Sequence, residues 1–368
     1  MRKIIAIIFL LVMQTMINAQ TINVYIGTYT GPNGSEGIYR AKLELQTGKL
    51  SEPELVAPMS QPSFIVISSS GKYLYATAEL KKETGQIKSF AIAPATGKLR
   101  PLNAVSSEGA TPCHLSLRRH VLVAANYTGG SVIAVPVRND GQLSEEVFVV
   151  KHQTQSTNPT GQTIPHPHSA NFGPDGGIFV ADLGLDLVRV YEWNYTSRQL
   201  VPSADIKTRH GAGPRHMSFH PNGHFAYLIN EKDETITVYS YDSHTAGYLK
   251  ELQTVSTLPA DFKGKSWCAE VKVHPNGKFL YGSNREHDSI VRFRIDPRTG
   301  LLSDPVFQQQ GIRWPRHFNL TPDGRYCLVA NQKGDNVVVF RVNPENGTLE
   351  PTEHHIAISQ PTCIQFLP

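Results

Sequence analysis

Six ionisable side chains, on segments far apart in the sequence, include the groups needed for acid–base catalysis on an anionic substrate. They are His168, Arg215, Glu231, Glu270, Arg285 and Arg316. The pKa of histidine, near 6.5, suits proton transfer at neutral pH, and a carboxylate partly withdrawn from water can share that work. Guanidinium groups bind carboxylates and phosphates and stabilise negative charge that develops on oxygen.

The chain repeats one sequence motif seven times, and these residues depart from the repeated pattern. Each copy has a strand opened by a small or turn residue, a Pro-Asn/Asp-Gly-like turn, and a second strand that ends in Asn or a substitute. At spacings of 46 to 55 residues, the copies begin at Pro62, Pro112, Pro167, Pro214, Cys268, Pro315 and Pro361. A period near 50 with several short strands in each copy is typical of a β-propeller. Residues shared by all copies then build the blades, and departures need another explanation.

The repeat predicts an all-β fold, a seven-bladed propeller of four-stranded antiparallel blades. The first strand-like segment, residues 24–28, reads as a second strand with no first strand before it. The last segment, residues 361–368, reads as a first strand with nothing after it. We therefore expect the C-terminal strand to join the N-terminal blade and close the ring, which also removes an exposed sheet edge.

Two adjacent positions at the end of the second strand behave differently. The strand-end residues are Thr28, Ala78, Asn126, Asp182, Asn230, Asn284 and Asn331. Such oxygen ligands suit calcium, but short polar side chains at a corner commonly bond the backbone, and a feature of most copies favours a blade role. The residues that follow are Tyr29, Glu79, Tyr127, Leu183, Glu231, Arg285 and Gln332. Glu231 and Arg285 occupy the same position in consecutive blades. They form either a structural salt bridge or part of a functional site.

The heads of the first strands carry further ionisable groups. One residue after the opening come Ser63, Cys113, His168, Arg215, Ala269, Arg316 and Thr362. The next residues are Phe64, His114, Ser169, His216, Glu270, His317 and Cys363. Innermost strands line the channel, so these heads surround one mouth with more charge than an inert lining needs. Because neighbours in a strand alternate, we expect Arg215, His168 and Arg316 to face the cavity. The histidines of the second set, His114, His216 and His317, are then structural or support the residues that face the cavity, unless they bind a metal.

The N-terminus predicts export. Arg2 and Lys3 precede an apolar run from Ile4 to Val12, and Ala19 offers a cleavage site. Residues 1–19 therefore read as a signal peptide, with an uncleaved anchor as the alternative, and residues 20–368 as one propeller domain. The expected location is periplasmic or secreted, with no membrane attachment after cleavage.

The net charge argues against nucleic-acid binding, and the cysteine positions argue against a zinc site. Losing Arg2 and Lys3 lowers the formal charge from +4 to +2, which gives no electrostatic footprint for nucleic acid. The four cysteines fall mostly in blades that do not touch and include no C-x-x-C pair, so we expect free, partly buried thiols and no zinc site. These cysteines are Cys113, Cys268, Cys327 and Cys363.

Several motifs together resemble the seven-bladed propeller lactonase family, which includes a bacterial 6-phosphogluconolactonase and, more distantly, the fungal carboxy-cis,cis-muconate cyclase. The motifs cover the mature chain and include Tyr25-Ile-Gly-Thr-Tyr-Thr30, Pro112-Cys-His114, Pro165-His-Pro-His168, Ala181-Asp-Leu-Gly-Leu-Asp186, Gly213-Pro-Arg-His216, Asn230-Glu231, Ala269-Glu270, Asn284-Arg285 and Pro315-Arg-His317. The resemblance implies a site of one His, two Arg and one Glu at the channel mouth. Carried over by motif, the catalytic set is His168, Arg215, Glu231 and Arg285, with His166 the less favoured histidine.

The implied activity is hydrolysis of a small-molecule lactone by a monomer, with no cofactor and no metal. Arg316, Glu270, His166 and His114 are the expected substrate-binding or supporting residues. Either His168 or Glu231 is the base and the other the acid. Because phosphorylated sugar lactones are cytosolic, an exported relative can act on a different lactone. Two alternatives remain, a cycloisomerase of the muconate cyclase type and a propeller that only binds partners on its rim.

Overall fold

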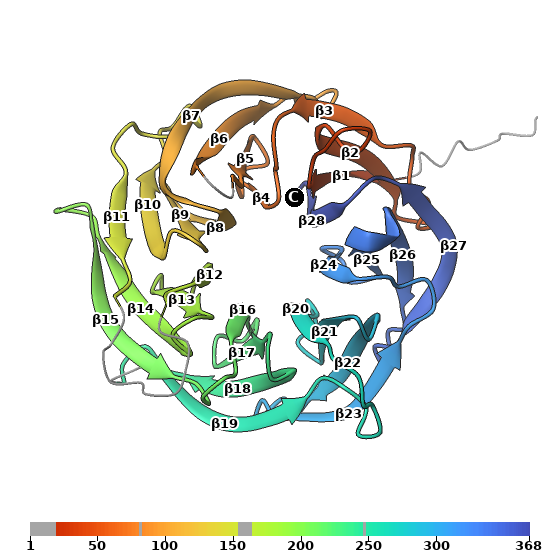
Figure 1. Cartoon of the computed structure of the whole chain (residues 1–368). Helices are drawn as coiled ribbons and strands as arrows, with labels where there is room; N and C mark the ends of the chain where they lie inside the picture. The colour runs from red at the N-terminus through yellow and green to blue at the C-terminus, as the bar shows by residue number, and fades with distance from the viewer. Residues whose placement is uncertain (1–19, 81–82, 154–163, 246–247) are drawn as a thin grey trace, which may run out of the picture.

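The structure confirms the predicted propeller. The computed structural model describes residues 20–80, 83–153, 164–245 and 248–368, so the predicted signal peptide, residues 1–19, lies outside the described residues. The described residues form seven four-stranded antiparallel sheets, arranged as blades of a ring around a central channel (Figure 1). In each blade the first strand of the repeat lies innermost and the fourth lies at the rim (Figure 1).

The blades are numbered here from the N-terminus, with strands given from the channel outward. Blade 1 contains β28 (Pro361–Phe366), β1 (Thr21–Thr28), β2 (Gly37–Glu44) and β3 (Glu54–Pro58). Blade 2 contains β4 (Ile65–Ile67), β5 (Tyr73–Ala78), β6 (Thr84–Ile92) and β7 (Leu99–Ala110). Blade 3 contains β8 (Pro112–Arg118), β9 (Val121–Asn126), β10 (Ser131–Pro136) and β11 (Phe148–Lys151).

The remaining blades follow the same order. Blade 4 contains β12 (Pro167–Phe172), β13 (Ile178–Asp182), β14 (Leu187–Asn194) and β15 (Gln199–Lys207). Blade 5 contains β16 (Pro214–Phe219), β17 (Phe225–Asn230), β18 (Thr235–Tyr241) and β19 (Leu249–Ser256). Blade 6 contains β20 (Trp267–Val273), β21 (Phe279–Arg285), β22 (Ser289–Ile295) and β23 (Leu302–Gln308). Blade 7 contains β24 (Pro315–Leu320), β25 (Tyr326–Asn331), β26 (Asn336–Val342) and β27 (Leu349–Ala357).

Blade 1 is built from both ends of the chain, as the sequence predicts. β28 pairs antiparallel with β1, with Val24 opposite Phe366 and Gly27 opposite Cys363. The backbone N–H of Leu367 also donates a hydrogen bond to the carbonyl of Asn23 at 2.9 Å. The C-terminal strand therefore occupies the innermost place of the first blade and leaves no open edge there.

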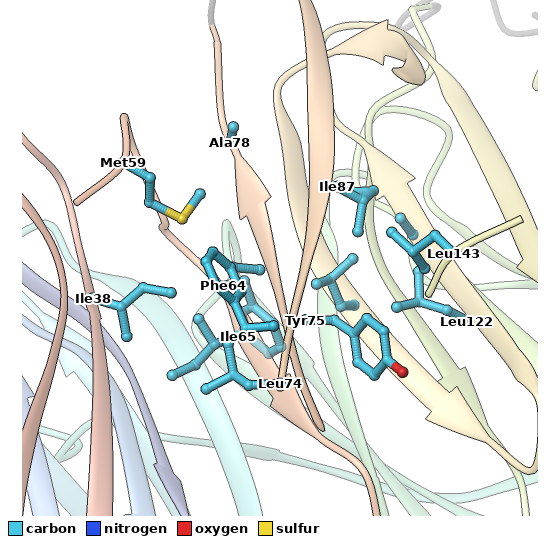
Figure 2. Packing of buried hydrophobic residues seen from close by; sticks show 14 of the residues in the cluster. Ile38, Met59, Phe64, Ile65, Leu74, Tyr75, Ala78, Ile87, Leu122 and Leu143 are labelled. Carbon is cyan, nitrogen blue, oxygen red and sulfur yellow. The ribbon is translucent and has the colours of Figure 1, made fainter. Parts of the chain in front are cut away.

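Adjacent blades pack through buried apolar side chains. Figure 2 shows this packing around blade 2, where Ile65 and Leu74 lie on the side of Ile38 in blade 1, and Tyr75 lies on the side of Leu122 in blade 3. Burial of apolar area contributes about 25 cal/mol per Å². The blade interfaces therefore supply most of the stability of the ring.

A second contact ties each of several blades to the next. The hydroxyl of a buried tyrosine on the second strand donates to the carbonyl of the turn glycine between the third and fourth strands of the following blade, as from Tyr227 to Gly300 at 3.0 Å. Gly300 has φ +72°, and a Cβ there would lie 2.4 Å from the Phe225 ring, so the turn requires glycine.

β-Bulges at the strand heads place the candidate site residues. Between Pro112 and His114, Pro167 and Ser169, Pro214 and His216, and Pro315 and His317, the register with the second strand shifts by one residue. The extra residues are Cys113, His168, Arg215 and Arg316. A bulge redirects side chains at the end of a strand. Simple alternation from the sequence therefore does not apply at these heads, and two successive side chains can approach the channel.

The strand-end corner residues have a structural role, as the sequence favours. The side-chain Nδ2 of Asn126, Asn284 and Asn331 donates to the backbone carbonyl of Ser107, Thr257 and Gly311, at 2.7, 2.8 and 2.8 Å. Asp182 accepts hydrogen bonds from the backbone N–H groups of His166, Gly184 and Leu185. These side chains thus fasten blades 3, 4, 6 and 7 to the segments beside them.

The four cysteines are free, which confirms the prediction, and all four are buried. No helix in the described ranges has the length and apolar character needed to cross a bilayer.

Candidate functional site

A cavity of about 320 Å³ opens where the strand heads surround the channel. Its walls come almost entirely from the two variable positions of the repeat, the bulged strand heads and the residues that follow the second strands. The lining residues are Tyr29, Glu79, Thr111, Cys113, Tyr127, Thr128, His168, Glu231, Arg285 and Arg316. The structure therefore brings His168, Glu231, Arg285 and Arg316 together from four blades, whereas Arg215, which was also expected to face the cavity, is buried behind its wall and does not line it.

Glu231 joins the two predicted arginines in a buried ion-pair chain. Its Oε2 lies 2.9 Å from Arg215 Nε and 2.9 Å from Arg285 Nη2. Both guanidinium groups also donate to blade 6 backbone carbonyls, Arg215 to Ala269 and Arg285 to Cys268. Carboxylate and carbonyl partners together fix the orientation of the two cations.

The ion pairs determine the charge of Glu231. Burial alone would raise the pKa of the carboxyl group, but the guanidinium groups of Arg285, Arg215 and Arg316 outweigh burial and hold that pKa below its usual value. Glu231 is therefore ionised at neutral pH and has no proton to donate.

Among the predicted histidines, His168 lines the cavity and has a ring nitrogen without a hydrogen-bond partner in the described residues. It is 7% exposed and lines the cavity, and burial, followed by the positive charge of Arg215, moves its pKa well below 6.5. Its Nδ1 is enclosed and has no hydrogen-bond partner among the described residues. At neutral pH the ring is thus uncharged and able to accept a proton.

Arg316 belongs to a second network on the opposite wall. Its Nη2 donates to the hydroxyl of Tyr29 at 2.8 Å, and the guanidinium lies 5.1 Å from the centre of that ring. The Tyr29 hydroxyl in turn donates to the Glu79 carboxylate at 3.1 Å. Arg316 therefore faces the cavity with its position fixed by an aromatic ring and a carboxylate.

The other predicted binding residues do not line the cavity. Glu270, 2% exposed, lies deeper in the channel between His216 and His317, at 3.1 and 3.2 Å from their ring nitrogens. His114 is also deeper, where its ring packs against Phe64 at 4.4 Å. Both are the second residues of their strand heads, so they lie one residue further along the innermost strand than the first residues of the heads.

His166 also lies outside the cavity wall. Its ring stacks on Tyr127 at 4.5 Å, and its Nδ1 lies 3.0 Å from the Tyr127 carbonyl oxygen. His166 thus holds Tyr127 in place, whereas Tyr127 itself lines the cavity.

Three lining residues did not stand out in the sequence. Tyr29, Glu79 and Tyr127 occupy the same repeat position as Glu231 and Arg285, so the signal was present. Their types do not distinguish them from tyrosines and carboxylates elsewhere in the blades.

Cations outnumber carboxylates in the assembled site. It holds three guanidinium groups, on Arg215, Arg285 and Arg316, and two carboxylates, on Glu231 and Glu79. An excess of one positive charge favours an anionic ligand or an oxyanion that forms during reaction. No group of three or more His, Cys, Asp or Glu side chains able to hold a metal occurs within the described part of the chain.

Comparison with known proteins gives a consistent set of similarities. A family model described as lactonase, 7-bladed beta-propeller, matches residues 23–366. A 6-phosphogluconolactonase of Bacillus subtilis is 34% identical over 297 residues, 79% of this chain and 83% of the relative. A 6-phosphogluconolactonase of Formosa agariphila is 29% identical over 287 residues, 76% of this chain and 80% of the relative. The solved structure of a periplasmic gluconolactonase of Pseudomonas aeruginosa has a TM-score of 0.88 at 32% identity, covering 95% of this chain and 99% of that one.

Proposed function

Because this chain belongs to the seven-bladed β-propeller lactonase family, we propose that it hydrolyses a sugar lactone built on the gluconolactone ring, at the channel-mouth cavity. The observation that carries the proposal is the convergence there of an uncharged His168 with the Arg215–Glu231–Arg285 chain and Arg316. Ring opening of a lactone needs a base, a stabilised oxyanion and an acid. This one cavity contains candidates for each.

His168 is the base in this mechanism. It accepts a proton from water while the water oxygen bonds to the lactone carbonyl carbon, and the carbonyl oxygen takes the negative charge. Arg285 and Arg316 stabilise that oxyanion, or an anionic group of the substrate. Collapse of the intermediate breaks the ring C–O bond, and the leaving alkoxide takes the proton back from His168.

Glu231 has an electrostatic role rather than a proton-transfer role. Its carboxylate is held ionised between Arg215 and Arg285, so it fixes the two cations. Of the two assignments that the sequence left open, the proposal takes His168 as both base and acid.

The proposal also includes two expectations from the sequence, export of the protein and a monomeric state. The N-terminal segment of Arg2, Lys3 and an apolar run supports export, and the similar Pseudomonas protein is described as periplasmic. An exported enzyme meets unphosphorylated lactones more readily than cytosolic phosphorylated ones.

A lactone screen on purified protein of residues 20–368 tests the function. We expect hydrolysis of gluconolactone or its 6-phosphate that persists with a chelator, and the faster of the two identifies the substrate. If the folded protein hydrolyses neither lactone, the proposal is contradicted. If the product is an isomer of the substrate and not the ring-opened acid, a cycloisomerase is favoured.

A matched pair of arginine variants locates the activity. Arg316→Ala should lower kcat/KM about 10- to 100-fold, as expected for loss of a charged hydrogen bond worth roughly 1.5–3 kcal/mol. Arg118→Ala is the control, because Arg118 bonds the carbonyls of Gly173 and Pro174 at the far end of β8. Equal losses in both variants would place the activity elsewhere.

A further inference from the structure

Three histidines occupy the same repeat position but bond differently. His114 Nδ1 accepts a hydrogen bond from the backbone N–H of Ala170 at 3.4 Å, and His317 Nδ1 accepts one from the backbone N–H of Ile364 at 3.3 Å. In both cases the donor lies on the innermost strand of the next blade. These two histidines therefore join blades.

His216 departs from that pattern. Its Nδ1 lies 3.1 Å from Glu270 Oε2 on the next blade. Glu270 is buried, and Lys272 and His317 hold it at 3.6 and 3.2 Å. Burial would raise the pKa of Glu270, but the charge of Lys272, together with that of Arg215 and the hydrogen bond from the Val271 backbone N–H, outweighs it and lowers that pKa. An ionised carboxylate therefore faces His216, which makes His216 Nδ1 the protonated nitrogen.

Two neighbouring rings each contain an enclosed nitrogen without a partner. His216 Nε2 and His168 Nδ1 are both buried and make no hydrogen bond to any described residue. The two ring centres are 5.2 Å apart, with planes inclined at 63°. A buried polar group left unpaired costs about 1–3 kcal/mol, and such groups in native proteins require an explanation.

The protonation of His216 determines what its neighbour can do. With the proton on Nδ1, the Nε2 of neutral His216 is an acceptor. The complementary state of the neighbouring His168 ring has its proton on Nδ1, which makes that enclosed nitrogen a donor. This state leaves His168 Nε2, the nitrogen available to the cavity, with a free lone pair.

We propose that Glu270 and His216 are positioning residues for the base, in a chain from the Glu270 carboxylate through His216 to His168 Nδ1–H. The proposal rests on the proposed lactonase function for its kinetic consequences only. Hydrogen bonds in an unliganded site are often long and shorten when substrate binds, which fits two adjacent unpaired atoms. When His168 accepts a proton from water on Nε2, its Nδ1–H becomes a stronger donor and the Glu270 charge stabilises the imidazolium. No proton leaves His216 or Glu270.

Kinetics on three variants separate positioning from folding. In Glu270→Gln and His216→Gln, kcat should fall by at least about 10-fold with KM within about 2-fold, because the base loses its orientation but the binding cations remain. The acid limb of the kcat/KM profile should also move to lower pH, since the imidazolium loses stabilisation. An unmoved limb with unchanged kcat would overturn the proposal.

His220→Gln is the matched control. His220 lies one residue beyond β16, is also buried, and bonds the carbonyl of Gly277 on the next blade at 2.8 Å. It should lose stability without a change in kcat or in the pH limb. If His216→Gln differs from wild type only as His220→Gln does, the role of His216 is structural.

A spectroscopic test does not depend on activity. Long-range ¹H–¹⁵N correlation of histidine-labelled protein at pH 7, with His168 assigned from the His168→Gln spectrum, reports which ring nitrogen holds the proton. We expect Nδ1–H in the wild type and Nε2–H in His216→Gln. Nε2–H in the wild type would overturn the chain even if the lactonase function holds, and Nδ1–H would support it even if no lactone is hydrolysed.

Discussion

Asn284 and Arg285 are neighbours in the sequence, yet they illustrate the two roles of the blades. The Asn284 side chain bonds the carbonyl of Thr257 and so fastens blade 6 to its entering segment, a contact repeated at other corners. Arg285, one residue later, reaches across to Glu231 in the cavity. The repeated position thus builds the scaffold and the variable position builds the site, and mutations at the two should have separable effects.

Removal of the closing strand should have the largest effect on the scaffold. Deleting residues 361–368 takes away the innermost strand of blade 1 and exposes the edge of β1. We expect the whole domain to lose cooperative folding, as measured by thermal denaturation and solubility. A truncated protein that melts like the full chain would mean that closure contributes little.

Acidification should lower the free energy of unfolding through the buried histidines of the innermost strands. Burial lowers the pKa of His114 and His317 to about 3, and lowers those of His168 and His216 well below 6.5. The unfolded chain then binds protons first, so stability is complete above pH 6.5 and is lost as pH falls toward the folded-state values. Each histidine should contribute up to about 1.4 kcal/mol of loss per pH unit. Urea unfolding at pH 7 and pH 5.5 measures the difference, and equal midpoints would contradict the histidine burial.

A single corner should matter less. Asn331→Ala removes the hydrogen bond to the Gly311 carbonyl in blade 7, where the next residue, Gln332, does not line the cavity. We expect a loss of about 1–3 kcal/mol in unfolding free energy. Chemical denaturation measures this loss. An unchanged free energy of unfolding would mean that the corner asparagine does not stabilise the blade.

Reducing agent should have the smallest effect. The four cysteines are free and buried, and burial raises the pKa of Cys268 and Cys363 to about 12, so they remain unreactive thiols. Melting with and without reductant should give the same Tm. A drop with reductant would reveal a disulfide.

The repeat predicted the fold, which the structure confirms, and it singled out the residues now proposed for the site because each departs from an otherwise regular position. Glu270 and His114 were expected at the substrate and instead lie deeper. Alternation along the strand had already favoured a structural role for His114, whereas the bulges at the strand heads depend on pairing with the second strand and are not visible in the sequence. Tyr29 was missed for another reason, since its cavity role depends on its contacts with Arg316 and Glu79.

The most direct test of the separation between site and scaffold compares His168→Ala with Asn331→Ala in one assay of lactone hydrolysis and one of thermal stability. His168→Ala should lower kcat/KM by about 10²- to 10⁴-fold, as expected for a general base, with little change in Tm, since its enclosed Nδ1 makes no hydrogen bond to a described residue. Asn331→Ala should lower Tm and leave kcat/KM of the folded protein unchanged. Hydrolysis that survives in His168→Ala would contradict the account.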